Sequence, residues 1–473
     1  MLIRSELTIV APATTPGTGA ITIIRISGPQ AFSVCDAVVA LRHGKVVDAE
    51  GYSVHYGTVY SGRDVLDEVL VTVFRAPHSY TGEDSVEISC HASPYIASEL
   101  LRLLVDAGAS YAEPGEFTQR AFLNGKMDLA QAEAVADVIS STSSAAHRVA
   151  LNQLRGGFSS ELQQMRGELL DMASLMELEL DFSEEDVEFA DRTRLSSLLD
   201  SVLSHVKRLT DSFRLGNAVK NGVPVAIVGA ANAGKSTLLN ALLGEDRAIV
   251  SDIAGTTRDT IEETFNLDGV LFRFIDTAGL RESSDIVERI GIERTFKKIS
   301  EADIVLCVLD LASDSVDLLN NVKTLAHAVD FEKQKVVFLL NKADFVGDKV
   351  LNKNVSVLND FVSCLDFQID TLVMSAKTGM GLDHLKKLLV DFEKDLVSNT
   401  DSTLITNLRH YEALTHAASA LQAVRSGLAT SLPTDLVAED LRTALAALSE
   451  ILGSSITPQE TLENIFKNFC IGK

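Results

Sequence analysis

The residues with the clearest chemistry are 229–236, which read GAANAGKS. They match the pattern G-x-x-x-x-G-K-[ST], in which the backbone N–H groups of a loop surround a polyphosphate. The apolar run 225–228 precedes the loop, as a buried parallel strand would, and a helix is expected to follow it. In that setting Lys235 pairs with the β- and γ-phosphates, and the hydroxyl of Ser236 is placed to bind Mg²⁺. A glycine-rich turn can match this pattern by chance, so the interpretation depends on the motifs further along the chain.

The next motif is a D-x-x-G element. Residues 276–279 read DTAG and follow the apolar run 272–275. In GTPases the aspartate of this element, here Asp276, holds Mg²⁺ through water, and the N–H of Gly279 can sense the γ-phosphate. Its position after a second expected strand supports the phosphate-binding interpretation of the first loop.

Two later motifs are of the kind that recognises the nucleotide base. Residues 341–344 read NKAD after the apolar run 336–340, and residues 375–377 read SAK. The carboxylate of Asp344 can accept hydrogen bonds from N1–H and the exocyclic amine of guanine, which adenine cannot supply. In the SAK element a backbone amide can meet the guanine carbonyl. Four motifs in this order predict guanine nucleotide binding. The residues expected to contact the nucleotide are Asn232, Ala233, Gly234, Lys235, Ser236, Thr237, Ser251, Asp252, Ile253, Ala254, Gly255, Thr256, Thr257, Asp276, Thr277, Ala278, Gly279, Asn341, Lys342, Ala343, Asp344, Ser375, Ala376 and Lys377.

The hydrolytic apparatus differs from that of many small GTPases, which carry a glutamine after D-x-x-G to orient the attacking water. Leu280 stands there in this chain. The amide oxygen of Asn232 is a candidate ligand for a monovalent cation, and residues 251–259 (SDIAGTTRD) can wrap the phosphates and offer carbonyl oxygens to the same ion. A potassium ion there would supply the charge that an arginine finger supplies elsewhere. Glu288 is a candidate to orient water, although a glutamate in a helical segment is more often an inert surface residue.

The composition is that of a globular cytoplasmic protein. A chain of 473 residues is long enough for about two to four domains, and 46% of its residues are hydrophobic. The first residues do not form a signal peptide, because their apolar stretch is short and contains Glu6. No apolar run reaches the length of a membrane span. The five cysteines are scattered without a C-x-x-C pair, so neither a disulfide framework nor a zinc site is expected.

The charge balance limits how nucleic acid can be bound. A formal charge of −24 argues against broad, unaided contact with a phosphate backbone, which requires lysine and arginine. If RNA is the substrate, a local basic patch or a basic partner has to carry most of the binding. Taken alone, the acidity is more simply explained by solubility.

Residues 1–125 are expected to form a mixed α/β domain. Its expected elements are strands at 21–28, 65–74 and 86–90 and helices at 31–41 and 94–107. Charged residues inside these strands, such as Arg25 and Glu87, are most simply interpreted as lying on a solvated face.

The rest of the chain reads as a helical domain interrupted by the nucleotide-binding unit. Residues 126–221 and 394–473 have helical periodicity, and residues 222–393 carry the nucleotide motifs. Apolar stripes mark the helices: Leu162, Met165, Leu169, Met172 and Met176 before the unit, and Leu441, Leu445, Leu448 and Leu452 after it. The methionines are interpreted as core filling. One helical domain with an insertion and two independent helical domains are both compatible with this pattern.

Over nearly its whole length the chain resembles the MnmE (TrmE) family of tRNA modification GTPases. In the G domain the resemblance rests on GAANAGKS, SDIAGTTRD, DTAGLRE, VERIGIERT and NKAD. In the N-terminal domain it rests on PGTGAI, IIRISG, SYTGEDSVEIS and PGEFTQRAFLNGKMDLAQAEAVAD. The chain ends in CIGK, and a terminal C-x-G-K is a mark of this family.

The resemblance implies a multidomain fold of α/β and all-α parts. These are an N-terminal α/β domain for dimerisation and folate binding, a helical domain, and an inserted Ras-like P-loop G domain. It also implies a homodimer that works with the FAD protein MnmG in a heterotetramer or larger complex, with tRNA held mainly by the partner. The reaction implied adds an aminomethyl or carboxymethylaminomethyl group at C5 of the wobble uridine, position 34, from a folate-derived one-carbon unit.

The resemblance further assigns site residues. The K⁺ ligands are Asn232, Ser251, Ile253 and Thr256, and the Mg²⁺ ligands are Ser236 and Thr257. Glu288 orients the attacking water, and Lys235 is the catalytic cation. The contacts to 5-formyltetrahydrofolate fall on Arg25, Glu87, Lys126 and Lys473. Cationic side chains and a carboxylate suit a ligand with a glutamate tail and a donor-rich pterin ring.

Two departures from the family pattern lie near the implied folate pocket. Thr15-Pro16 stands where two prolines are common, and residues 90–93 read CHAS where a glycine-rich His-Gly-Gly is common. Cys470 can be read as a nucleophile, but no histidine that would activate it is evident nearby in the sequence, so a structural role near the pocket is favoured.

Two other classes of function compete with this interpretation. A ribosome-assembly GTPase would have a similar G domain but should carry a basic RNA-binding appendage, whereas the flanking region here is acidic and helical. A folate enzyme that works alone, with its own redox cofactor, would be favoured by a G-x-G-x-x-G fingerprint after a strand. No such fingerprint is found in the first domain.

Overall fold

The computed structural model describes most of the chain. The described residues are 6–181, 192–244, 263–268, 270–275, 299–365, 367, 369–397, 403–430, 432–454, 462, 465–467, 469 and 472.

By its internal contacts the chain divides into two compact units. The first contains Met1–Ile139, Asn152–Ser204 and Ala413–Lys473, and the second contains Ser140–Leu151 and His205–Glu412. The division falls inside helices, among them α7 (Arg192–Asp211) and α15 (Leu408–Ala429).

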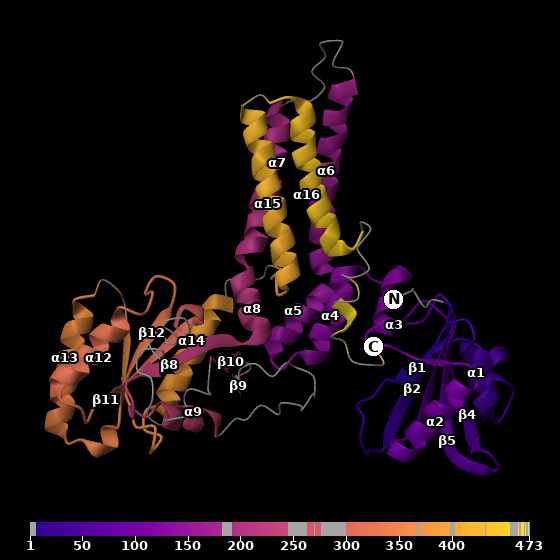
Figure 1. The fold of residues 1–473 in the computed structure, drawn as a ribbon, viewed down its shortest axis with the longest axis horizontal. Helices are drawn as coiled ribbons and strands as arrows, with labels where there is room; N and C mark the ends of the chain where they lie inside the picture. The colour runs from indigo at the N-terminus through magenta and orange to yellow at the C-terminus, as the bar shows by residue number, and fades with distance from the viewer. Residues whose placement is uncertain are drawn as a thin grey trace. The chain divides into compact units, whose positions relative to one another are not determined.

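A seven-stranded sheet begins the first unit (Figure 1). Its strands are β1 (Ile9–Pro12), β2 (Ile21–Ser27), β3 (Val39–Leu41), β4 (Ser53–Ser61), β5 (Asp64–Phe74), β6 (Ser85–His91) and β7 (Ser110–Tyr111). The order is β3-β4-β5-β6-β2-β1-β7, and neighbouring strands are antiparallel except for β1 and β7, which are parallel.

Alternation along the strands gives this sheet two different faces. In β5 the residues Val69, Val71 and Val73 are buried, whereas Leu70 between them is exposed. The buried face packs under α1 (Ala31–Val38) and α2 (Pro94–Asp106). The helix expected at 31–41 is therefore predicted too long. At Val39 the backbone becomes extended, and residues 39–41 pair with β4 instead of continuing the helix.

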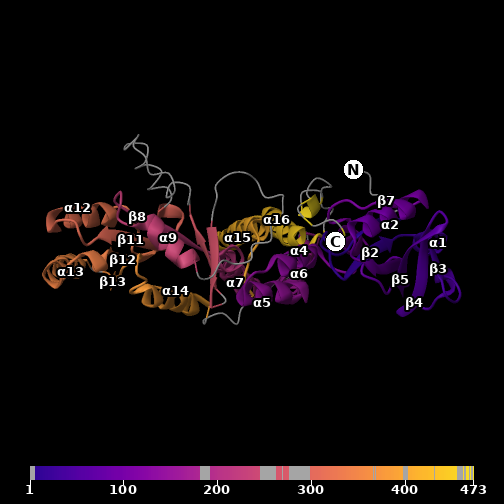
Figure 2. The ribbon, with the colours of Figure 1, turned by 90° about the horizontal axis from the view of Figure 1, so that it is seen from below.

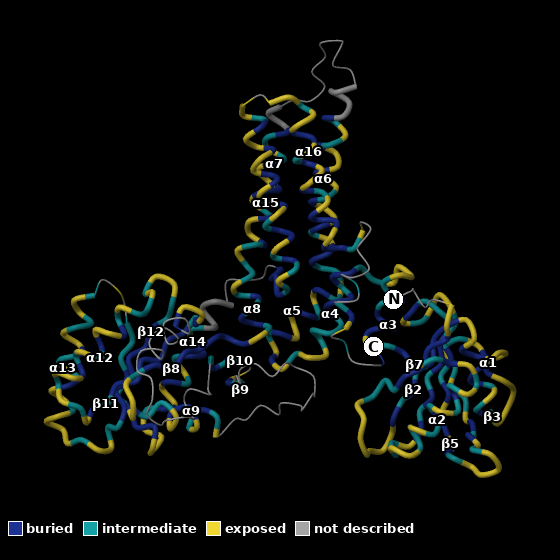
Figure 3. The backbone as a smooth tube through the Cα atoms, in the orientation of Figure 1, coloured by how far each residue is buried: buried dark blue, intermediate teal, exposed yellow. Residues whose placement is uncertain are grey.

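Helices form the rest of the first unit. They include α3 (Glu116–Leu123), α4 (Leu129–Ser140), α6 (Gly157–Asp181) and α16 (Thr434–Leu452). The stripe from Leu162 to Met176 on α6 is buried, each of its five members being at most 2% exposed, which confirms the core interpretation of the methionines. Helix α6 packs against α16, and Nε of Arg166 donates a hydrogen bond to Oγ of Ser449 at 3.0 Å. Figure 3 shows the buried stripes of these helices.

The described residues near the C-terminus lie against the N-terminal domain. Phe466 packs on Leu129 and Ala132 of α4. At Gly115, just before α3, a Cβ would lie 2.8 Å from the carbonyl oxygen of Phe466. At Gly472 a Cβ would collide with the carbonyl oxygen of Pro12. Gly472 therefore lies beside β1.

The second unit contains a six-stranded sheet of order β13-β12-β11-β8-β10-β9. Its strands are β8 (Val223–Gly229), β9 (Glu263–Leu267), β10 (Val270–Phe274), β11 (Ile304–Asp310), β12 (Lys335–Asn341) and β13 (Asp370–Val373). All neighbours are parallel except β9 and β10. Helices α9 (Lys235–Leu243) and α14 (Leu382–Val397) cover one face, and α12 (Ser315–Ala326) and α13 (Asp348–Ser363) cover the other (Figures 1 and 2). Burial on both faces explains the continuous apolar runs in the sequence.

Segments outside the nucleotide motifs complete this unit. Ala146 of α5 (Ser144–Leu154), Val219 of α8 (Phe213–Asn221) and Leu404 form one buried cluster. A Cβ at Gly216 of α8 would collide with the carbonyl oxygen of Ile405, so the two segments touch backbone to backbone. The chain enters and leaves the six-stranded sheet through neighbouring segments.

Among the described residues, no helix is both long enough and apolar enough to cross a membrane.

Candidate functional site

The loop between β8 and α9 has the geometry that its glycines predict. Gly229 has φ +151°, and a Cβ there would collide with the carbonyl oxygen of Val308 in β11. Gly234 has φ +99°, and a Cβ there would collide with Nδ2 of Asn341. Both positions require glycine, because a side chain would meet rigid neighbours and the backbone lies in a region that L-residues avoid. The loop therefore packs closely on β11 and on the end of β12.

Lys235 is the first residue of α9, at the positive end of the helix dipole. Its Nζ donates hydrogen bonds to the carbonyl oxygens of Gly229, at 2.9 Å, and of Ala230, at 2.8 Å. The ammonium group is thus held over the loop, and burial lowers the pKa of Lys235 below its usual value. Ser236 and Thr237 follow in the first turn and are exposed.

Asn341 joins three of the predicted motifs. Its side chain is 3% exposed. Nδ2 donates to the carbonyl oxygen of Ala233 in the first loop at 2.8 Å, and Oδ1 accepts a hydrogen bond from the N–H of Ala376 at 2.9 Å. One buried amide of the NKAD segment therefore connects it to the GAANAGKS and SAK segments, through a backbone group of each.

The SAK segment also orients the carboxylate of Asp344. Oγ of Ser375 donates to Oδ1 of Asp344 at 2.6 Å, and the same Oγ accepts from the N–H of Thr378 at 3.2 Å. Ser375 is buried, whereas Asp344 is exposed. A fixed carboxylate with an open side can accept hydrogen bonds from two adjacent N–H donors, the pattern of guanine.

Asp310 is a residue of this region that the sequence analysis missed. Its Oδ2 lies 2.6 Å from Nζ of Lys342, and its Oδ1 accepts from the N–H of Ala312 at 2.9 Å. Lys342 itself has a left-handed backbone, φ +67°. A usable signal was present, because Asp310 ends a buried apolar strand in the same way as Asn341 does.

The structure thus brings together Asn232 to Thr237, Asn341 to Asp344 and Ser375 to Lys377 at the carboxyl edge of the parallel strands. The other predicted residues of the nucleotide site lie outside the described ranges, as do two predicted residues at the C-terminus. These are Ser251, Asp252, Ile253, Ala254, Gly255, Thr256, Thr257, Asp276, Thr277, Ala278, Gly279, Glu288, Cys470 and Lys473.

A second group of predicted residues lies on the N-terminal sheet. Arg25 and Glu87 are cross-strand neighbours on β2 and β6, and Nε and Nη2 of Arg25 donate to Oε1 of Glu87 at 2.9 and 2.8 Å. The guanidinium carbon lies 5.4 Å from the ring centre of Tyr80 and 5.7 Å from that of Phe117. The side chains are 20% and 23% exposed, so the expectation of a solvated face is wrong for this pair. The aromatic rings that cover it come from a loop and a helix distant in sequence.

Four residues in α3 and the turn after it hold the loop before β6. The hydroxyls of Tyr80 and Thr118 are 2.9 Å apart. Nδ2 of Asn124 donates to the carbonyl oxygen of Thr81 at 2.7 Å, and Nζ of Lys126 donates to that of Pro77 at 2.9 Å. Lys126 is therefore attached to the loop that carries Tyr80.

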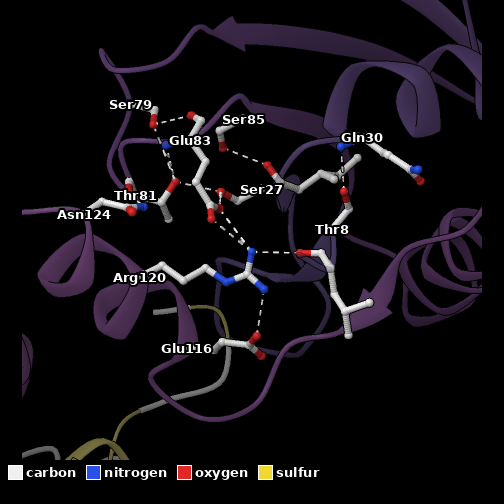
Figure 4. Close-up of polar contacts among 12 residues, drawn as sticks. Thr8, Ser27, Gln30, Ser79, Thr81, Glu83, Ser85, Glu116, Arg120 and Asn124 are labelled. Atoms are coloured by element: carbon white, nitrogen blue, oxygen red, sulfur yellow. Dashed lines mark hydrogen bonds and ion pairs between the residues drawn. The ribbon is translucent and has the colours of Figure 1, made fainter. Parts of the chain in front are cut away.

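The fourth of these residues is Arg120, which is 4% exposed (Figure 4). Its Nη1 donates to the carboxylate of Glu83 at 3.1 Å and to the carbonyl oxygen of Leu7 at 2.9 Å, and its Nη2 donates to Glu116 at 2.9 Å. Glu83 also accepts from Oγ of Ser27 at 2.8 Å. This network fixes residues 79–83 between β2 and α3, and with them the ring of Tyr80 over Arg25.

Comparison with protein families assigns both parts of the chain. Residues 8–126 match the model of the GTP-binding protein TrmE N-terminus, and residues 129–470 match that of the MnmE helical domain.

Curated relatives match along the whole chain. The tRNA modification GTPase MnmE of Bacteroides fragilis is 48% identical over 470 residues, which cover 98% of this chain and 99% of the relative. That of Christiangramia forsetii is 49% identical over 471 residues, with the same coverage. Among solved structures, Aquifex aeolicus Era bound to GDP and AlF₄⁻ is 26% identical and covers 42% of this chain and 66% of that one. Its TM-score of 0.28 is too low to support an argument about fold.

We predict that Arg120→Leu destabilises the N-terminal domain by about 3–5 kcal/mol, because Glu83 and Glu116 would be left buried without their cation. Hydrogen exchange of peptides that cover β2 and residues 79–84, in the full-length chain, measures this loss. The matched control is Arg102→Leu, since Arg102 is 54% exposed and pairs with Glu99 at the surface, where an ion pair contributes at most about 1 kcal/mol. Equal effects of the two substitutions would show that the buried network does not fix this loop.

Proposed function

The chain belongs to the MnmE (TrmE) family of tRNA modification GTPases, and on that premise we propose that it is a K⁺-activated GTPase that modifies the wobble uridine of tRNA together with an MnmG-type FAD protein. The observation that carries the GTPase part of this proposal is the bridge made by Asn341. It holds a phosphate-binding loop and a guanine-recognition segment in one rigid arrangement.

The nucleotide is bound by the residues of the four motifs. Asp344 reads the base, and Ser375 keeps its carboxylate in place. Ala376 and Lys377 approach the guanine carbonyl, and residues 232–237 surround the phosphates, with Lys235 as the cation. Asp310 supports this arrangement through Lys342. Residues 276–279 complete the γ-phosphate side.

Two metal ions are assigned to the phosphates. Ser236 and Thr257 bind Mg²⁺, and the position of Ser236 in the exposed first turn of α9 fits this role, because a hydroxyl oxygen is a ligand that Mg²⁺ accepts. Asn232 binds K⁺ with Ser251, Ile253 and Thr256. Asn232 is exposed and has a left-handed backbone, φ +62°, at the rim of the loop. When bound, the two cations neutralise charge on the transferring phosphoryl group.

Hydrolysis depends on contact between two copies of the chain. Asn232, Ser251, Ile253 and Thr256 would hold K⁺, whose positive charge would favour contact between the two G domains of a dimer, and Glu288 orients the attacking water. Hydrolysis and phosphate release let the G domains part. The motion passes to the helical domain, which we propose is one domain made of 126–221 and 394–473, with the G domain, 222–393, inserted. The packing of α6 on α16 supports a single helical domain.

The N-terminal domain, residues 1–125, binds a folate such as 5-formyltetrahydrofolate. Arg25, Glu87, Lys126 and the terminal Lys473 are the proposed contacts. Within the described part of the chain, Nη1 of Arg25 and Oε2 of Glu87 have no hydrogen-bond partner. Nη1 can therefore donate to a carboxylate of the folate, and Oε2 can accept from an N–H group of its pterin ring. The position of Gly472 beside Pro12 supports a contribution from the C-terminus, because β1 is the neighbour of β2.

The same domain is the proposed dimerisation surface. The sheet face opposite α1 and α2 exposes Ile21, Val54, Tyr56 and Leu70, which are 65%, 59%, 43% and 48% exposed. A cluster of exposed apolar side chains on a regular sheet marks an interaction site in an otherwise water-facing domain. A second copy of the chain is the occupant that the family resemblance implies.

The partner protein supplies what this chain lacks for the modification. MnmG contributes FAD and most of the tRNA contact, in a heterotetramer or larger assembly. The net charge of −24 is consistent with tRNA being held mainly by the partner. The folate provides the one-carbon unit for C5 of uridine 34, where an aminomethyl or carboxymethylaminomethyl group is installed. We place the reaction in the cytoplasm.

The experiment that tests the function is mass spectrometry of tRNA nucleosides from cells with and without the gene. We expect uridines with C5-aminomethyl-type groups at position 34 to vanish with the gene and to return when it is restored. Unchanged modification together with accumulation of unassembled ribosomal subunits would contradict the proposal and favour an assembly GTPase.

Base recognition is tested by Asp344→Asn. The side-chain NH₂ of asparagine would face an N–H group of guanine, so that two donors oppose each other. We therefore expect GDP affinity to fall by about 10²-fold or more. Affinity for xanthosine diphosphate should rise, because xanthine has a carbonyl oxygen in place of the exocyclic amine. Competition against a fluorescent GDP analogue measures both. Asp348→Asn is the matched control, because Asp348 is exposed in the first turn of α13. If GDP affinity is retained in Asp344→Asn, guanine is not recognised by this carboxylate.

The hydrolytic step is tested by Glu288→Ala. We expect normal GTP affinity but about 10²-fold slower GTP turnover in K⁺. A rate loss of this size is usual when a group that positions or deprotonates the attacking water is removed. The intact protein should also slow when Na⁺ replaces K⁺. Glu301→Ala, an exposed glutamate, serves as the control for a general effect of lost charge. Wild-type turnover in Glu288→Ala would remove this residue from the mechanism, and equal rates in the two salts would exclude the cation model.

A further inference from the structure

The second unit contains a cavity of about 450 Å³ that is separate from the nucleotide site. It is lined by Asp303, just before β11, by the loop that leads into β12, and by Ile369, just before β13. These positions are at the amino ends of the parallel strands. The P-loop, Asn341 and Ser375 follow the carboxyl ends, at the opposite edge of the same sheet. The volume is within the range of small-molecule sites.

The apolar side of the cavity is aromatic. The rings of Phe331 and Phe367 are stacked, with centroids 5.3 Å apart and an interplanar angle of 17°. Phe367 is 41% exposed, although a ring of this size usually has most of its surface covered. Phe392 of α14 and Leu215 of α8 form further parts of the wall. A flat apolar molecule could extend this stack and cover the exposed ring.

The polar side is a guanidinium group in a fixed position. Nε and Nη2 of Arg214 donate to Oδ1 of Asp303, at 2.8 and 2.5 Å, and Nη2 also donates to the carbonyl oxygen of Lys333 at 2.7 Å. Two of its three nitrogens are thereby held. Within the described ranges, Nη1 has no hydrogen-bond partner, so its N–H groups are free to bind an anion in a defined geometry.

The charges around the rim limit the size of that anion. The carboxylate of Asp303 is occupied by Arg214, but Asp211 and Glu332 also line the cavity and are exposed. Lys333 is 74% exposed and pairs with Asp330 at 3.3 Å, whereas Lys335 pairs with Asp370. The charge of Arg214 is balanced by Asp303, so Nη1 offers hydrogen bonds rather than excess positive charge. The two open carboxylates would repel a polyanion such as a nucleotide more strongly than a single negative charge.

We propose that this cavity is a binding site for a small, planar aromatic monoanion, such as an aromatic carboxylate or sulfonate. The ring of the ligand stacks on Phe331 and Phe367, and its anionic group binds Nη1 of Arg214. Such a ligand would touch both α8 and the strands' amino ends. It would therefore stabilise the attachment of α8 to the sheet, by an amount that rises with the logarithm of the ligand concentration once the site is nearly full.

The test uses 8-anilinonaphthalene-1-sulfonate, an aromatic monoanion whose fluorescence rises on binding, and N-phenyl-1-naphthylamine, a closely similar neutral molecule. Each probe is titrated into the full-length chain both with saturating GDP and without it. For the sulfonate we expect saturable binding of one molecule per chain at this site, unchanged by GDP because the nucleotide occupies the opposite edge of the sheet. Arg214→Gln should weaken the sulfonate by about tenfold or more and leave the neutral probe unaffected.

Phe367→Ser should weaken both probes, and Tyr95→Ser, which removes a 68% exposed ring from the N-terminal domain, should weaken neither. Far-UV circular dichroism and GDP affinity show that each variant is folded. Sulfonate binding that is unchanged in both Arg214→Gln and Phe367→Ser would overturn the proposal, and so would displacement of the probe by GDP. This experiment measures neither GTP turnover nor tRNA modification. Failure of the cavity proposal would therefore leave the proposed function intact, and failure of the proposed function would leave the cavity proposal intact.

Discussion

The nucleotide-binding region depends on one buried amide. The side chain of Asn341 has one acceptor and two donor hydrogens, and it uses both ends to connect loops that follow two different strands. A buried amide whose partners are backbone groups cannot move without leaving those groups unsatisfied, at a cost of about 1–3 kcal/mol each. The close approach of Gly234 to the same amide removes the remaining freedom. The loop after β8 and the NKAD and SAK segments therefore share one fixed geometry.

The positions of these segments in the fold could be predicted from the sequence, because each motif is local. A strand, a turn and the polar residue that ends it are neighbours in the chain, and parallel strands necessarily bring such ends to one edge. Gly229, Gly234, Asn341 and Ser375 could all be placed by that rule. The same rule places Asp310 at this edge, but its pairing with Lys342, 32 residues away, could not be predicted from spacing.

Long-range contacts explain what sequence reasoning missed in the N-terminal domain. Arg25 and Glu87 lie inside strands, and period-two alternation places them on the face away from the helical core, so a solvated position followed naturally. In the structure the rings of Tyr80 and Phe117 lie against Arg25. The segments that carry these rings are fixed by the ion pairs of Arg120 with Glu83 and Glu116. Similarly, residues 39–41 continue a helical pattern, but pairing with β4 is the stronger constraint. Local propensity is overridden wherever a distant segment supplies a better partner.

The close contact between Gly216 and Ile405 has a consequence for how the second unit can be isolated. A fragment cut at the motif boundaries, 222 to 393, would keep every nucleotide motif but lose α8, residues 403–407 and the α5 segment. The apolar residues of the sheet against which Ala218 packs would then be more open to water. A fragment that keeps this packing intact is thus longer than the segment that carries the nucleotide motifs, and it includes the residues near 145. A truncation made at the motif boundaries would change the packing of the second unit as well as its length, so its effect on activity could not be assigned to the removed residues alone.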